Sequence, residues 1–121
     1  VDGFYEWVSE DGGRRPRWLH RPGGGLLLLA GLWRPEADGL AFVILTTPAN
    51  GLVSGLHGRM PAILAPEQAE AWLARPDGSL LVPAPEEWLV ATPVGSRVNS
   101  VLHDDPECLA PPPPRRQGSL F

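Results

Sequence analysis

The sequence contains no lysine and only one cysteine, Cys108, among its 121 residues. A single cysteine excludes an internal disulfide and a cysteine-rich zinc site. The longest apolar run, Leu26 to Leu32, is too short to span a bilayer. No charged segment followed by an apolar one stands at the amino end. These absences predict a soluble protein of the reducing cytoplasm that has no membrane partner.

Positively charged residues are also few. The sequence has ten arginines and 14 acidic residues, which gives a net charge of −4. This balance argues against a compact nucleic-acid binder, which is usually basic. One local exception is a cluster of four arginines between residues 14 and 21 that alternates with Trp18 and His20. Such a cluster can contact phosphates and bases, or it can form the solvated end of a hairpin. Both interpretations stay open.

The 15 prolines and 14 glycines predict many turns and short elements. Apolar and β-branched runs predict strands over 3–8, 15–20, 26–33, 40–47 and 88–94, with further extended segments at 60–64 and 97–102. The run at 26–33 is typical of a buried strand. Residues 48–55 favour a short helix or loop, and 67–73 a helix that packs Trp72 and Leu73 inward. The fold class is therefore mixed α+β, strand-rich with short helices.

Two motifs each hold one side chain suited to proton transfer. They are Asp2-Gly3-Phe4-Tyr5-Glu6-Trp7 and Leu56-His57-Gly58-Arg59-Met60-Pro61. Glu6 lies in a strand pattern, where it is either solvent-exposed or placed in an apolar pocket that favours its protonated form. His57 lies on a glycine-flanked loop, where it is either an acid or base or an ordinary surface residue. Together the two side chains suggest a catalytic pair.

Other polar residues in the second motif and shortly before it have two interpretations each. Arg59 can bind a phosphate or carboxylate with its planar guanidinium, or form a surface ion pair. Thr46 and Thr47 end a strand, where their hydroxyls either contact a ligand or cap the next turn. Arg59 and the two threonines are therefore candidates for binding a ligand, and the sequence pattern does not identify that ligand.

The remaining candidates for chemistry are weak. Acidic residues precede Cys108 and disfavour its thiolate, so we expect a poor nucleophile. His20 and His103 have no partner at metal-ligand spacing. The sequence has no P-loop, GxGxxG or HExxH motif. We therefore expect neither a metal nor a cofactor.

Four motifs in order resemble the SRAP family of SOS-response-associated peptidases, or abasic-site processing proteins. They are the two motifs above together with Ala30-Gly31-Leu32-Trp33 and Thr46-Thr47-Pro48-Ala49-Asn50. The resemblance covers residues 1–109, as the C-terminal part of an SRAP-like domain that is incomplete at its N-terminus. Residues 110–121 are rich in proline and arginine and are expected to form a flexible tail.

The resemblance implies a monomeric protein that binds single-stranded DNA and is joined covalently to an abasic site. In the family, the amine and sulfur of an N-terminal cysteine, exposed by autoproteolysis, close a thiazolidine on the opened sugar. By motif, Glu6 and His57 would be the catalytic residues. Trp7, Thr46 and Arg59 would contact the DNA.

Two departures from the family pattern stand out. The N-terminal cysteine and the segment that follows it are not in this sequence, and Gly58 stands where the family usually has Asp. These departures leave two alternatives to the crosslinking activity. One is a thiol peptidase that acts on peptides, and the other is a truncated, noncatalytic product with exposed apolar faces.

Overall fold

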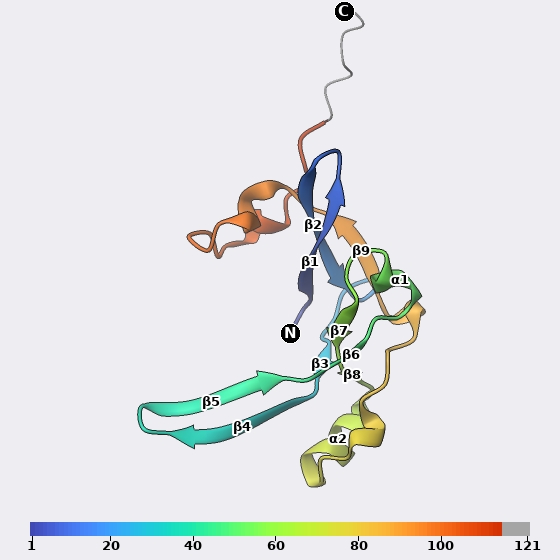
Figure 1. Ribbon diagram of the computed structural model, residues 1–121, viewed down its shortest axis with the longest axis vertical. Coiled ribbons are helices and arrows are strands. Elements are labelled where there is room, and N and C mark those ends of the chain that lie inside the picture. The colour runs from blue at the N-terminus through green and yellow to red at the C-terminus, as the bar shows by residue number, and fades with distance from the viewer. Residues whose placement is uncertain (115–121) are drawn as a thin grey trace, which may run out of the picture.

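The computed structural model describes residues 1–114 and has the predicted mixed α+β, strand-rich fold (Figure 1). Its largest sheet is antiparallel, with the order β1 (Phe4–Glu10), β2 (Gly13–His20) and β9 (Val90–Pro93). Three strand pairs follow: β3 (Leu28–Leu29) with β8 (Ile63–Leu64), β4 (Gly31–Glu36) with β5 (Gly39–Ile44), and β6 (Thr46–Pro48) with β7 (Arg59–Pro61). The helices are α1 (Gly51–Ser54), α2 (Pro66–Ala74) and the 3-10 turns η1 (Gly78–Leu80), η2 (Glu86–Trp88), η3 (Ser96–Asn99) and η4 (Pro106–Leu109).

The hairpin of β1 and β2 follows from its turn residues. Asp11 and Gly12 both adopt positive φ, at 49° and 75°. This backbone matches the right-handed twist of the flanking strands and explains the Asp-Gly pair. The turn fixes the register, which sets Glu6 opposite Arg17 and Trp7 opposite Pro16.

Gly3 has no space for a side chain. A Cβ atom there would lie 2.6 Å from the backbone oxygen of Leu19 and would also clash with the Trp18 indole. The missing side chain lets the start of the first motif pass beneath Trp18, whose ring stacks on His20 with centroids 4.0 Å apart. Both ring nitrogens of His20 also have hydrogen-bond partners, the backbone oxygen of Arg21 and the hydroxyl of Thr92. His20 is thus part of the fold.

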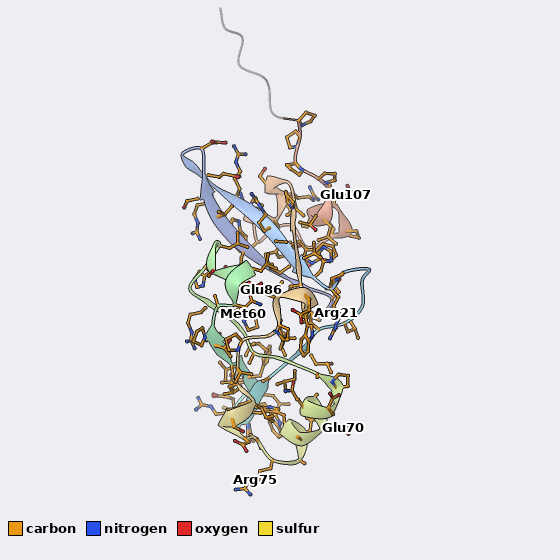
Figure 2. All side chains as sticks on the ribbon, turned by 90° about the vertical axis from the view of Figure 1, so that its right-hand side faces the viewer. Arg21, Met60, Glu70, Arg75, Glu86 and Glu107 are labelled. Atoms are coloured by element: carbon orange, nitrogen blue, oxygen red, sulfur yellow. The ribbon has the colours of Figure 1, made fainter. Side chains whose placement is uncertain are left out.

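Two buried clusters hold the sheets together. The larger contains Leu19, Leu27, Val53, Met60, Ile63, Ala84 and Leu89, and the smaller contains Ala30, Ala62, Leu64 and Trp72. Met60 is 1% exposed and lies in the middle of the molecule (Figure 2). Because Met60 belongs to β7, burial of its side chain anchors the strand that begins with Arg59.

Two predicted strands are each split in the structure. The run at 26–33 breaks at Ala30 and the run at 40–47 breaks at Leu45, where backbone hydrogen bonds form a closed triangle. The Ala30 N–H donates to Ala62, Ala62 to Leu45, and Leu45 to Ala30, each at 2.9 Å. At this junction the strands exchange partners, and small buried residues at positions 30 and 62 allow the close approach. Local sequence patterns do not contain this long-range pairing.

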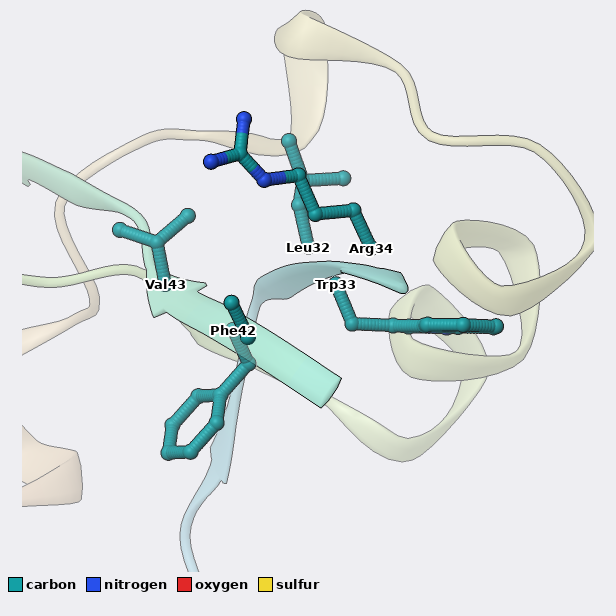
Figure 3. A pocket seen from close by; sticks show the side chains of 6 residues that line it. Leu32, Trp33, Arg34, Phe42 and Val43 are labelled. Carbon is teal, nitrogen blue, oxygen red and sulfur yellow. The ribbon is translucent and has the colours of Figure 1, made fainter. Parts of the chain in front are cut away.

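The prediction that 26–33 forms a buried strand is wrong for most of its residues. Strands β4 and β5 form a projecting hairpin (Figure 1) whose apolar side chains are exposed, with Trp33 at 68% and Phe42 at 76%. Figure 3 shows Leu32, Arg34 and Val43 on one side of the hairpin and Phe42 on the other. Leu32, Val43 and Leu40 are also exposed. Both faces of this hairpin therefore present apolar surface.

Two further expectations are corrected by the packing. In α2, Trp72 is buried and its indole N–H donates to the backbone oxygen of Gly31 at 3.0 Å, but Leu73 is 84% exposed. Adjacent residues of a helix point about 100° apart, so one narrow contact cannot bury both. The segment 97–102 is not extended, because residues 96–99 form η3 and the Arg97 guanidinium binds Asp105.

The predicted tail lies partly outside the described residues, which end at 114. At its start, the backbone oxygen of Ala110 accepts a hydrogen bond from the Gly95 N–H at 2.9 Å. Flexibility of residues 110–121 stays a prediction.

Candidate functional site

Glu6 is half-buried in the middle of β1. Its cross-strand neighbour Arg17 does not bind it, because that guanidinium donates to the Glu10 carboxylate at 3.1 Å. Glu6 forms no ion pair within residues 1–114. The central position in a paired strand holds its backbone in place, while its carboxylate stays available to an incoming group.

Trp7 points to the opposite face of β1 from Glu6, since successive strand residues alternate. Its indole N–H donates to the Asn99 side-chain oxygen at 2.7 Å, and the Tyr5 ring lies with its centroid 6.3 Å away. Burial raises the pKa of Tyr5, so its phenol stays neutral. Asn99 was not predicted as a site residue, and 92 positions separate it from Trp7. No local signal in the sequence joins the two.

Arg59 and Thr46, both predicted to bind DNA, are brought together by the pairing of β6 with β7. The Arg59 Nε and Nη2 atoms donate to the Thr46 hydroxyl at 3.2 and 3.0 Å, and Nη2 also donates to the Thr46 backbone oxygen at 2.9 Å. These contacts orient the guanidinium. Its Nη1 edge has no hydrogen bond to any residue of the described part, so it can still receive an anion.

His57 lies between α1 and β7, two residues before the arginine that it contacts. Its Nδ1 atom is 3.1 Å from both the backbone nitrogen and the backbone oxygen of Arg59. When Nδ1 carries a proton it donates to the oxygen, and when it does not it accepts from the N–H. In both cases Nε2 is left without a partner among residues 1–114, as proton transfer at that atom requires.

The short helix α1 fixes the approach to His57. The Asn50 side-chain oxygen caps the helix by accepting from the Val53 N–H at 2.9 Å, and its amide nitrogen donates to the Ala84 oxygen at 2.9 Å. The Asn50 backbone N–H lies 3.3 Å from the Met60 sulfur. Asn50 thus joins α1, β7 and the segment before η2, and its place in the Thr46–Asn50 motif is a structural one.

Gly58 occupies open space. A Cβ atom built there meets no other atom within 4 Å, and its φ is outside the range that favours glycine. An aspartate at this position would therefore fit without rearrangement of the loop.

The predicted residues fall into two groups. His57, Arg59 and Thr46 lie together around β6 and β7, whereas Glu6 and Trp7 belong to the sheet of β1, β2 and β9. The larger buried cluster connects these two sheets, since Leu19 of β2 and Met60 of β7 are both members. The meeting of Glu6 and His57 at one ligand stays a prediction.

The arginine cluster at 14–21 also divides. Arg17 binds Glu10, and Arg21 donates to the Leu26 oxygen at 2.7 Å while its guanidinium lies 5.8 Å from the centre of the Trp88 ring. These two arginines serve the fold. Arg14 and Arg15 are exposed and form no ion pair among residues 1–114.

Cys108 is 4% exposed, with its sulfur 3.6 Å from the His103 oxygen. A buried thiol in this position is out of reach of a substrate. Within residues 1–114, no group of three or more His, Cys, Asp or Glu side chains is placed to hold a metal ion. No helix in that range is long and apolar enough to cross a membrane.

Comparisons with known proteins match most of the chain. The model of the SOS response associated peptidase (SRAP) family matches residues 1–101. The abasic site processing protein HMCES of Gallus gallus is 36% identical over 142 residues, covering 92% of this chain and 42% of that protein. The abasic site processing protein YoqW of Bacillus subtilis is 35% identical, covering 90% of this chain and 54% of that protein.

Solved structures also share this fold. A protein from Bacteroides thetaiotaomicron superposes with a TM-score of 0.78 at 26% identity, covering 92% of this chain and 54% of that one. A protein from Bordetella bronchiseptica superposes with a TM-score of 0.68 at 30% identity, covering 78% of this chain and 52% of that one. The chain spans about half the length of the curated relatives that it matches. With the four sequence motifs and the matched fold, these similarities establish that the chain belongs to the SRAP family.

Proposed function

We propose that this chain forms part of a protein that links itself covalently to abasic sites in single-stranded DNA. Relatives are named abasic site processing proteins, and the family model matches residues 1–101. The observation that carries the proposal is the arrangement around β7. There the Arg59 backbone holds the Nδ1 atom of His57, whose Nε2 has no partner among residues 1–114, and Thr46 orients the guanidinium of the same arginine. This arrangement pairs a proton donor with an anion-binding group.

The opened abasic sugar carries an aldehyde, and the proposed attacking group is the amine of a cysteine outside the printed residues. As the new C–N bond forms and the C=O π bond breaks, Glu6 accepts the proton released by the amine and passes it to the former carbonyl oxygen, which becomes the carbinolamine hydroxyl. His57 then donates a proton from Nε2 to the carbinolamine hydroxyl, which leaves as water. Addition of the cysteine sulfur to the resulting iminium carbon closes the thiazolidine, and the thiol proton is released. The net change is loss of one water, with no oxidation or reduction.

The DNA contacts follow from the same geometry. Arg59 offers its free guanidinium edge to a phosphate beside the lesion, a contact that positions DNA without reading its sequence. The Trp7 ring offers a face on which an unpaired base can stack. Selectivity then comes from the missing base and from the single strand.

The test uses the product of the open reading frame that contains these 121 residues. It is incubated with single-stranded DNA that holds one abasic site, with the same DNA intact, and with unstructured peptides. We expect an adduct that survives heat and denaturing electrophoresis with the abasic DNA only. Cleavage of peptides without any DNA adduct would contradict the proposal in favour of a thiol peptidase.

A further inference from the structure

We propose that the hollow bordered by Trp7, Arg14 and Asn99 is a second nucleotide subsite, which takes an unpaired base and phosphate beyond the lesion. The inference rests on the proposed function only in supposing that the ligand is single-stranded DNA. It extends the DNA path from Trp7 toward the β1–β2 turn. Neither Arg14 nor Asn99 has a place in the chemistry described above.

The register of the hairpin brings the first two residues together. Trp7 lies opposite Pro16, and Ser9, two residues further along β1, lies opposite Arg14. Trp7 and Arg14 therefore point to the same face of the sheet and are diagonal neighbours. Asn99, the last residue of η3, completes the border of the hollow.

Asn99 holds the Trp7 ring in one orientation. The indole nitrogen can only donate, so the 2.7 Å contact identifies the Asn99 atom as the oxygen. The ring is thus fixed before any ligand arrives, which lowers the entropic cost of stacking a base on it.

The same assignment frees a donor. With its oxygen bound to Trp7, the Asn99 side chain keeps its NH₂ group, which has no hydrogen-bond partner among residues 1–114. That group can donate to a carbonyl oxygen on the edge of a stacked base. An aromatic face and an adjacent amide donor are a combination that single-stranded nucleic-acid sites use.

Arg14 supplies the charge. Its side chain is exposed and forms no ion pair within the described range, in contrast to Arg17, which Glu10 neutralises, and Arg34, which binds Glu36. An unpaired guanidinium next to a fixed aromatic ring can hold the phosphate that follows a stacked base. The molecule carries net charge −4, so this local positive site is not a consequence of general basicity.

The experiment measures binding of the chain to a fluorescein-labelled, undamaged oligothymidylate by anisotropy across a range of salt concentrations. Arg14→Ala should weaken binding and lower the slope of log affinity against log salt by about 0.7, the value for one phosphate contact on a single strand. Arg75→Ala is the matched control, because Arg75 is an exposed arginine at the far end of α2 (Figure 2). Arg75→Ala should change neither the affinity nor the salt slope.

Asn99→Ala tests the stacking half of the subsite. Release of the ring and loss of the amide donor should weaken binding by roughly five- to one-hundred-fold without changing the salt slope. Its thermal unfolding midpoint is measured alongside, so that misfolding is recognised.

Equal affinity and slope in Arg14→Ala and Arg75→Ala would overturn the proposal. So would equal displacement of the oligonucleotide by polyglutamate at matched charge, because the site would then select an acidic peptide as readily as DNA. Since the probe has no lesion, failure of the crosslinking chemistry leaves these readouts unaffected.

Discussion

The imidazole of His57 has a backbone partner in either protonation state, because its Nδ1 lies equally close to the nitrogen and the oxygen of Arg59. A ring that keeps its partner can exchange a proton at Nε2 without reorientation. The same backbone belongs to the arginine that binds Thr46. The acid and the anion-binding group are therefore positioned by one short segment.

Glu6→Gln and His57→Gln should each slow adduct formation by roughly 10²- to 10⁴-fold, the usual contribution of one positioned acid or base. Neither residue is among the buried residues of the core, so the folded structure should persist. Single-turnover crosslinking on denaturing gels gives the rates, and circular dichroism gives the fold. Unchanged rates in both variants would remove the two residues from the mechanism.

Gly58→Asp should leave the free energy of unfolding within about 0.5 kcal/mol of the parent, because the side chain enters open space. The added carboxylate matches the residue that the family usually has beside the histidine, so the crosslinking rate should rise. Gly31→Asp is a useful contrast, since a Cβ atom at Gly31 lies 3.1 Å from the Val43 oxygen. A loss of stability at Gly58 equal to that at Gly31 would contradict this account.

At the scale of elements, α1 depends on one side chain. Asn50 is 8% exposed and binds both Val53 and Ala84. Asn50→Ala should lower the free energy of unfolding by about 2 to 3 kcal/mol, since it removes a helix cap and leaves the buried Ala84 carbonyl unpaired. Urea denaturation measures the change. Ser54→Ala, on the exposed end of the same helix, should cost much less, and equal losses would show that capping is not the cause.

The contact between η3 and η4 should depend on pH in one direction. The Arg97 guanidinium donates to Asp105 at 2.9 Å and holds the pKa of that carboxyl below its usual value. A lowered pKa means that the pair stabilises the fold fully above the unfolded-state pKa of Asp105 and loses this effect as the pH falls through the folded-state pKa. The NMR signal of the Trp7 indole N–H, bound to Asn99 of η3, should broaden only in that acidic range. Asp105→Asn should abolish this dependence, and its persistence would assign it to another group.

Elements set by local residues were predictable, and elements set by distant partners were not. The β1–β2 hairpin follows from its Asp-Gly turn, and α2 follows from Pro66 and the helix formers after it. The breaks at Ala30 and Leu45 depend on a hydrogen-bonded triangle with Ala62. Likewise, the resemblance assigned both Arg59 and Thr46 to DNA contact, but their pairing across β6 and β7 and the contact of Asn99 with Trp7 arise only through tertiary structure.

The whole molecule carries an exposed apolar hairpin. Trp33 and Phe42 are a cross-strand pair of β4 and β5, and both are mostly exposed. The double variant Trp33→Ser with Phe42→Ser should bind less of the dye anilinonaphthalene sulfonate, because apolar surface is removed. Its stability should fall by less than about 1 kcal/mol, the size of one cross-strand pair. Undiminished dye binding would place the accessible apolar surface elsewhere.

The central claim is that the Glu6 carboxylate and the His57 imidazole serve one sugar, although Glu6 lies in the sheet of β1, β2 and β9 and His57 in the loop before β7. A crystal structure of the open-reading-frame product bound to single-stranded DNA with an abasic site tests it most directly. The account predicts both side chains within hydrogen-bond distance of the opened sugar or of its adduct. A sugar that contacts only one of them, with the other directed to a separate surface, would contradict it.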